Sequence, residues 1–125
     1  REPNDGYWSN VWMKKPWVMC YWGGRPTQDW MFSQAYAEGA NWNDTFWSHE
    51  RFNKLLLEGR GELNAEKRAE IYREMQQILR DEGGVVVWAF ANYVYAMADK
   101  VQHGPKVAAN WELDGGRYVE RWWLA

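Results

Sequence analysis

Residues 64–83 constrain the fold of this chain more than any other segment. Ile71, Met75 and Ile78 recur at the spacings i, i+4 and i+7, which is the pattern of a helix that packs one face against a core. Asn64 stands where a side-chain oxygen can accept a hydrogen bond from the first turn. The sequence therefore predicts a long amphipathic helix, and the rest of the chain must supply the surface that its apolar face covers.

Two further helices are predicted before it. One begins with Ser48 as its N-cap and stops near Gly59 and Gly61, with apolar residues on one face: Phe52, Leu55 and Leu56. The other is capped by Thr27 or Asp29 and runs through Tyr36, with Gly39 ending it. After the long helix, Gly83 fits the left-handed position that often follows a helix C-terminus.

Two apolar segments are predicted to be buried strands. Residues 17–22 read W-V-M-C-Y-W and end at Gly23 and Gly24. Residues 85–90 are apolar on both alternations, as in a strand that is covered on both faces. After Asn92 the pattern becomes irregular and rich in turns. The expected fold class is α/β, or α+β when the chain is taken as an isolated piece.

Composition and motifs exclude several classes of protein. The net charge is −2 with acids and bases interspersed, which argues against a nucleic-acid partner. The chain has one cysteine, Cys20, and two well-separated histidines, so no zinc-type spacing is present. No serine stands in a G-x-S-x-G elbow and no P-loop occurs. We expect no enzyme, no cofactor and no metal site.

Residues 43–88 carry a family resemblance. The segment follows the order N-x-x-x-W-x-x-x-x-F-N-x-L, then the long helix, then two glycines and an apolar run. The matching positions are Asn43, Trp47, Phe52, Asn53, Leu55, Arg68, Tyr72 and Gln76. This order resembles the C-terminal quarter of the solute-binding proteins that serve ABC importers of peptides, opines and nickel, the family that includes the dipeptide- and oligopeptide-binding proteins.

The resemblance implies the C-terminal portion of a two-lobed, type II periplasmic-binding-protein fold. Residues 1–96 would form the C-terminal part of the second ligand-binding lobe, and residues 97–125 a tail that returns to the first lobe. The implied function is capture of a peptide, opine or saccharide-like solute, including an anionic one, for import. Implied partners are this small-molecule solute, a membrane permease and the N-terminal remainder of the same protein. The implied location is periplasmic, or lipid-anchored and extracellular.

Candidate ligand contacts lie at the end of the first predicted strand. Two glycines there allow a ligand backbone to approach, and in peptide-binding relatives the matching strand end hydrogen-bonds the ligand as an added strand. A turn without ligand accounts for the same residues. The candidates at this strand end and in the loop after it are Tyr21, Trp22, Gly23, Gly24, Arg25 and Asp29. Trp42, from a later segment, is a further candidate.

One departure from the family bears on the ligand. Peptide binders place an aspartate shortly after the tryptophan, where it pairs with the ligand's amine, whereas this chain has Arg25 there and Asp29 as the nearest acid. Either Asp29 takes over the amine, or the ligand is not an ordinary peptide and offers Arg25 a carboxylate or phosphate. The 11 tryptophans keep two other functions open: a freestanding aromatic-rich module that binds carbohydrate or a partner, and single-stranded nucleic-acid binding, which would need a positive groove.

Overall fold

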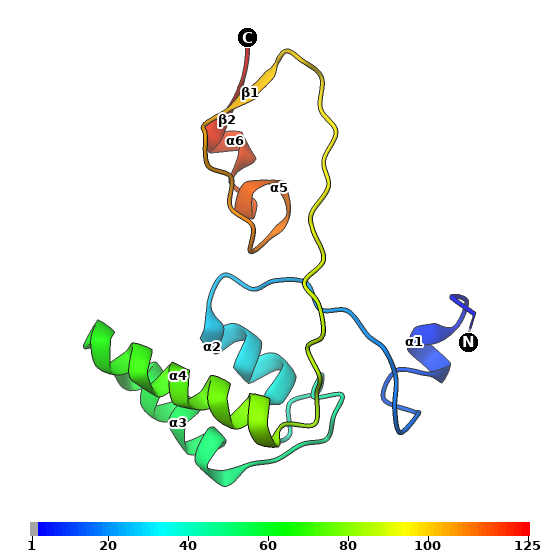
Figure 1. Cartoon of the computed structure of the whole chain (residues 1–125), viewed down its shortest axis with the longest axis vertical. Helices are drawn as coiled ribbons and strands as arrows, with labels where there is room; N and C mark the ends of the chain where they lie inside the picture. Colours follow the sequence, from blue (N-terminus) through cyan, green and yellow to red (C-terminus); the bar gives the residue numbers. More distant parts are fainter. Residues whose placement is uncertain (1–2) are drawn as a thin grey trace. The chain divides into compact units, whose positions relative to one another are not determined.

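The computed structural model describes residues 3–125, and the chain divides into two compact units. Unit 1 comprises Arg1–Trp22 and Thr27–Val86, and unit 2 comprises Gly23–Pro26 and Val87–Ala125. Figure 1 shows helices in both units and a two-stranded sheet in unit 2. The protein is therefore α+β, as expected for the chain taken as an isolated piece.

Two helices, α3 (Glu50–Gly61) and α4 (Ala65–Glu82), form the main hairpin of unit 1 and lie side by side in Figure 1. The side-chain oxygen of Asn64 accepts hydrogen bonds from the backbone N–H groups of Glu66 and Lys67, each at 3.0 Å, in the first turn of α4. The predicted cap is therefore confirmed. Gly59 is buried where the helices meet. A Cβ at this position would lie 3.1 Å from a methyl carbon of Ile71, which is a tight contact, so glycine suits the close approach of the two helices.

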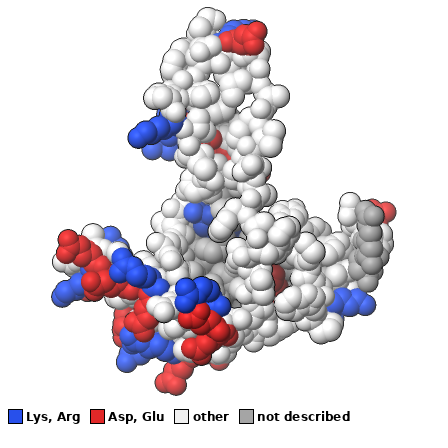
Figure 2. All heavy atoms as spheres, viewed as in Figure 1, with Lys and Arg blue, Asp and Glu red and all other residues white. Residues whose placement is uncertain are grey.

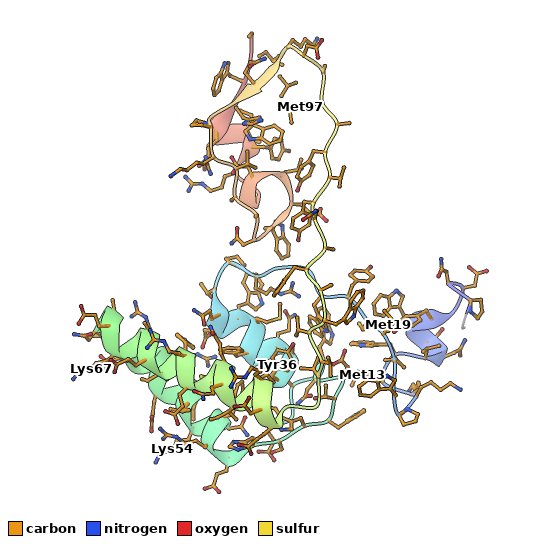
Figure 3. The ribbon with its side chains drawn as sticks, viewed as in Figure 1. Met13, Met19, Tyr36, Lys54, Lys67 and Met97 are labelled. Atoms are coloured by element: carbon orange, nitrogen blue, oxygen red, sulfur yellow. The ribbon has the colours of Figure 1, made fainter. Side chains whose placement is uncertain are left out.

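The core of unit 1 forms between this hairpin and a third helical segment. That segment begins as α2 (Gln28–Met31) and continues as the wider π-helical turn η1 (Phe32–Tyr36), with the Thr27 hydroxyl capping it as predicted. The rings of Phe32 and Tyr36 in this segment pack into the core that α3 and α4 form. The best-buried side chains of the two helices are Phe52, Leu55 and Met75. Figure 2 shows charged side chains gathered over α3 and α4, and Figure 3 shows Lys54 and Lys67 pointing away from the pair.

Two predicted helix ends are wrong in detail. His49, not Ser48, caps α3, because its Nδ1 accepts the backbone N–H of Phe52 at 3.2 Å. Gly83 is extended, with φ −72° and ψ 157°, and not left-handed. Glycine is needed there for a different reason: a Cβ would lie 2.2 Å from the carbonyl oxygen of Leu79.

Both predicted strands are also wrong. Residues 17–22 and 85–90 form no strand, and large side chains in them are exposed, Trp17 at 77% and Phe90 at 93%. A strand requires a neighbouring backbone to hydrogen-bond with, and no segment among residues 3–125 pairs with either one. The strands that do form are β1 (Val101–His103) and β2 (Trp122–Leu124), antiparallel and within the tail that was predicted to be irregular.

Unit 2 is organised around a buried carboxylate. Asp114 is 1% exposed and belongs to the short helix α5 (Glu112–Gly115), which precedes the short helix α6 (Tyr118–Arg121). It accepts hydrogen bonds from the backbone of Ala108 at 2.7 Å, from Arg121 at 2.9 Å and from the indole of Trp122 at 3.2 Å. These bonds tie the loop before α5 to α6 and β2.

Candidate functional site

Unit 1 holds a cluster of aromatic side chains apart from its helical core. Most come from the N-terminal segment, which contains the short helix α1 (Tyr7–Asn10). The first two residues of that segment, Arg1 and Glu2, lie outside the described residues. Figure 3 labels Met13 and Met19 in this segment. The aromatic cluster consists of Tyr7, Trp8, Trp12, Tyr21, Trp22 and Trp42.

The rings of this cluster contact one another at different angles. Trp8 meets Trp12 and Tyr21 edge-on, with centroids 5.6 and 5.8 Å apart. Trp22 and Trp42 are tilted by 57° at 6.1 Å. Tyr21 is 78% exposed and Trp42 is 47% exposed, so the cluster presents ring faces to solvent. Such faces suit stacking on a ligand or attraction of a cation.

A carboxylate joins two parts of this cluster. The Oδ2 atom of Asp44 accepts hydrogen bonds from the indole nitrogens of Trp12, at 2.8 Å, and Trp22, at 3.4 Å. Asp44 is half-buried. Sequence reasoning missed this residue, although it is the one acid in the aromatic stretch W-N-D-T-F-W of residues 42–47.

Asn43 fixes the loop that carries Asp44. Its side chain is 4% exposed, and its amide nitrogen donates to the carbonyl oxygens of Ala37, at 3.1 Å, and Trp47, at 2.8 Å. Its oxygen accepts the hydroxyl of Thr45 at 2.9 Å. Asn43 therefore anchors the loop before α3.

The negative charge of Asp44 acts on the groups around it. Burial raises the pKa of the Cys20 thiol, and the nearby Asp44 carboxylate raises it further. Burial and then Asp44 likewise raise the pKa of Tyr36. A thiol with a raised pKa stays protonated and is a poor nucleophile.

The structure brings together only some of the predicted ligand contacts. Trp22 and Trp42 are in contact, and Tyr21 touches the same aromatic cluster through Trp8. Asp29 is engaged elsewhere in unit 1: its two oxygens lie 3.2 and 3.1 Å from Nε and Nη2 of Arg60, and the hydroxyl of Tyr72 lies 3.4 Å away. A carboxylate with an arginine of its own chain is a weaker candidate for a ligand amine.

The remaining predicted contacts belong to unit 2. Nη1 of Arg25 donates to the carbonyl oxygens of Gly23 and Gly24, each at 3.0 Å, and its guanidinium lies 5.5 Å from the ring centre of Trp111. A Cβ on Gly24 would lie 1.9 Å from the carbonyl oxygen of Asn110. The close backbone approach that this glycine was expected to allow is therefore made by the chain itself.

No protein-family model, no curated protein and no solved structure matches this chain. Within residues 3–125, no group of three or more histidine, cysteine, aspartate or glutamate side chains could hold a metal ion. No helix in the same range is long and apolar enough to cross a membrane.

Proposed function

We propose that this chain belongs to the substrate-binding component of an ABC importer, in which a small solute is captured between two lobes. The order of motifs in residues 43–88 supports this, and so does the way the structure uses them. Asn43 anchors a loop, Phe52 enters the core from α3, and α4 packs on α3 with Tyr72 and Met75 buried. The block that resembles the family thus acts as a bracing unit.

The observation that carries a binding function is the contact of Trp22 with Trp42 beside Asp44. Trp22 ends the segment that the family uses for ligand contacts, and Trp42 comes from the loop that Asn43 holds in place. Two ring faces and one carboxylate, partly open to solvent, are the mixture of apolar surface and few polar groups that small-molecule sites use.

The exposed apolar segments support a larger, two-lobed, type II periplasmic-binding-protein fold. Residues 17–22 and 85–90 form no strand and expose large apolar side chains. Contact between such apolar surface and water is unfavourable. In the proposed protein, strands from the N-terminal remainder pair with these segments and cover them. Residues 1–96 then belong to the second lobe, and residues 97–125 form the tail that returns to the first.

The proposal also names partners and a location. Closure of the two lobes on a peptide, opine or saccharide-like solute would signal to a membrane permease, in the periplasm or at the outer face of the membrane. If the solute is anionic, Arg25 is the candidate cation for it. No chemical step by this protein is proposed.

The test compares the full-length protein with the 125-residue chain. Native mass spectrometry of the purified full-length protein identifies a retained solute, and calorimetric titration of that solute then gives both affinities. We expect the full-length protein to bind more tightly, and Trp42→Leu to weaken binding, whereas Trp123→Leu, at an exposed tryptophan of unit 2, leaves it unchanged. A full-length protein that retains and binds no solute would refute the proposal.

A second candidate is a freestanding aromatic-rich module that binds carbohydrate or a partner. It is favoured by one observation: the whole aromatic cluster lies within unit 1. Equal affinity of the 125-residue chain and the full-length protein would support this candidate and exclude a two-lobed site.

A further inference from the structure

Asp44 differs in its partners from Asp29 and Asp114, the other described aspartates that are not exposed. Asp29 pairs with Arg60, and Asp114 pairs with Arg121. None of the salt bridges formed among residues 3–125 includes Asp44, whose partners are the indole N–H groups of Trp12 and Trp22.

Indole N–H groups hold a carboxylate in place but do not neutralise it. Each is an uncharged donor, so the half-buried site keeps one full negative charge. Both donors reach the same oxygen, Oδ2. The field of this charge extends to the phenol of Tyr36 and the thiol of Cys20, whose pKa values it helps to raise. The carboxylate is therefore positioned and charged, with no cation of residues 3–125 paired to it.

The rings beside Asp44 favour the same sign of ligand. The faces of Trp22 and Trp42 carry the negative side of the ring quadrupole, and tryptophan attracts cations more strongly than the other aromatic residues do. Trp42 is 47% exposed, so a ligand can reach it from solvent. An anion would be repelled by both the carboxylate and the ring faces.

We infer that Asp44, Trp22 and Trp42 form a binding site for an organic cation that carries an alkylated ammonium group. Such a group places methyl or methylene surface against the rings and its charge near the carboxylate. A strongly hydrated metal ion would gain nothing from the rings. This inference rests on the proposed solute-binding function and names the chemical class of the solute.

The test uses the full-length protein and two probes of nearly equal shape. One probe is choline, and the other is its uncharged analogue, in which carbon replaces the quaternary nitrogen. Tryptophan fluorescence and calorimetry measure both affinities. We expect choline to bind roughly tenfold more tightly than the analogue, the difference of one charge interaction at a half-buried site.

Substitutions separate charge from shape. Asp44→Asn keeps an oxygen for the two indole donors, and we expect it to weaken choline roughly tenfold while the uncharged analogue changes less than about twofold. Glu70→Gln, which removes one exposed acid from α4, is the matched control and should leave both affinities unchanged. At Trp42, Phe should retain most of the choline affinity and Leu should lose it, which tests the ring if Asp44→Asn does not fold.

Either of two results would overturn the inference: equal affinity for choline and its analogue, or wild-type affinity for choline in Asp44→Asn. The outcome also separates this inference from the broader proposal. If the full-length protein retains a neutral or anionic solute and ignores choline, the solute-binding function stands and the cation site is wrong. If it binds neither a retained solute nor either probe, both fail.

Discussion

Replacing Asn43 tests how strongly one buried amide holds the loop before α3. Its nitrogen satisfies two carbonyl oxygens, those of Ala37 and Trp47, at a position that is 4% exposed. The Ala37 carbonyl also accepts the backbone N–H of Ala40 at 3.1 Å, so the substitution leaves the Trp47 carbonyl as the acceptor that loses its donor. A buried acceptor without its donor destabilises a fold by about 1–3 kcal/mol. Asn43→Ala should therefore lower the free energy of unfolding by about 1–3 kcal/mol, a large part of the roughly 5–15 kcal/mol typical of a domain.

Asn43→Asp should be worse than Asn43→Ala at neutral pH. It places a carboxylate oxygen against the same two carbonyls and buries a charge whose one side-chain donor in this loop is the Thr45 hydroxyl. At acid pH the protonated side chain can donate one hydrogen bond again, so part of the loss should be recovered.

The assay is urea unfolding followed by tryptophan fluorescence and circular dichroism, at neutral and at acid pH. Asn41→Asp, on an exposed residue of the same loop, adds the same charge and should change stability by less than about 0.5 kcal/mol. If Asn43→Asp and Asn41→Asp unfold at the same urea concentration at neutral pH, the reasoning about the buried amide is wrong.

Three further predictions concern the core, a helix cap and acid stability. Phe52→Ala, at a fully buried ring, should destabilise unit 1 by about 3–5 kcal/mol, whereas Leu57→Ala, on the exposed side of the same helix, should change stability by less than about 1 kcal/mol in urea unfolding. Asn64→Ala should remove the cap of α4 and about 1 kcal/mol, measured in the same way; no change would contradict the cap. The backbone N–H of Ala108 and the nearby Arg121 lower the pKa of Asp114. The ionised side chain therefore contributes fully to the free energy of unfolding at pH values above the ordinary pKa of a carboxyl, and this contribution is lost as the pH falls through the lowered pKa. An NMR pH titration of the residues of unit 2 should show the lowered pKa of Asp114 and the loss of its stabilising contribution at acid pH. Asp114→Asn should abolish both.

Local signals were enough to predict the helices. The cap at Asn64, the cap at Thr27 and the apolar spacing of the long helix each depend on residues within a few positions, and all three were right. Boundaries were less secure, because a histidine nitrogen can accept the capping bond that was assigned to a serine.

Strands could not be predicted in the same way. Residues 17–22 and 85–90 have strand composition, but pairing depends on a second segment that composition does not identify. The strands that form join Val101 to Leu124, and a three-residue pairing leaves too short a pattern to recognise in a sequence. The composition indicated which apolar side chains should be buried. It gave no information on the segment that would bury them.

The candidate site was predicted in part for a similar reason. Trp22 and Trp42 were both named and are in contact. Asp29 was named for its place in the sequence, yet its partner Arg60 comes from α3, 31 positions away. Asp44 was missed because only the fold reveals that Trp12 and Trp22 both donate to it.

Gly84 links the helical hairpin to the proposed cation site. A Cβ on this residue, just beyond α4, would lie 2.8 Å from the Cβ of Thr45, so Gly84→Ala must displace the loop. Thr45 bonds to Asn43, and Asp44 lies between them, so the carboxylate should move with the loop. We expect Gly84→Ala to weaken choline binding several-fold in the fluorescence titration although it adds no group near the rings. Gly61→Ala, where a Cβ would meet nothing within 4 Å, is the matched control and should leave binding unchanged. Wild-type choline affinity in Gly84→Ala would show that the position of Asp44 does not depend on this contact.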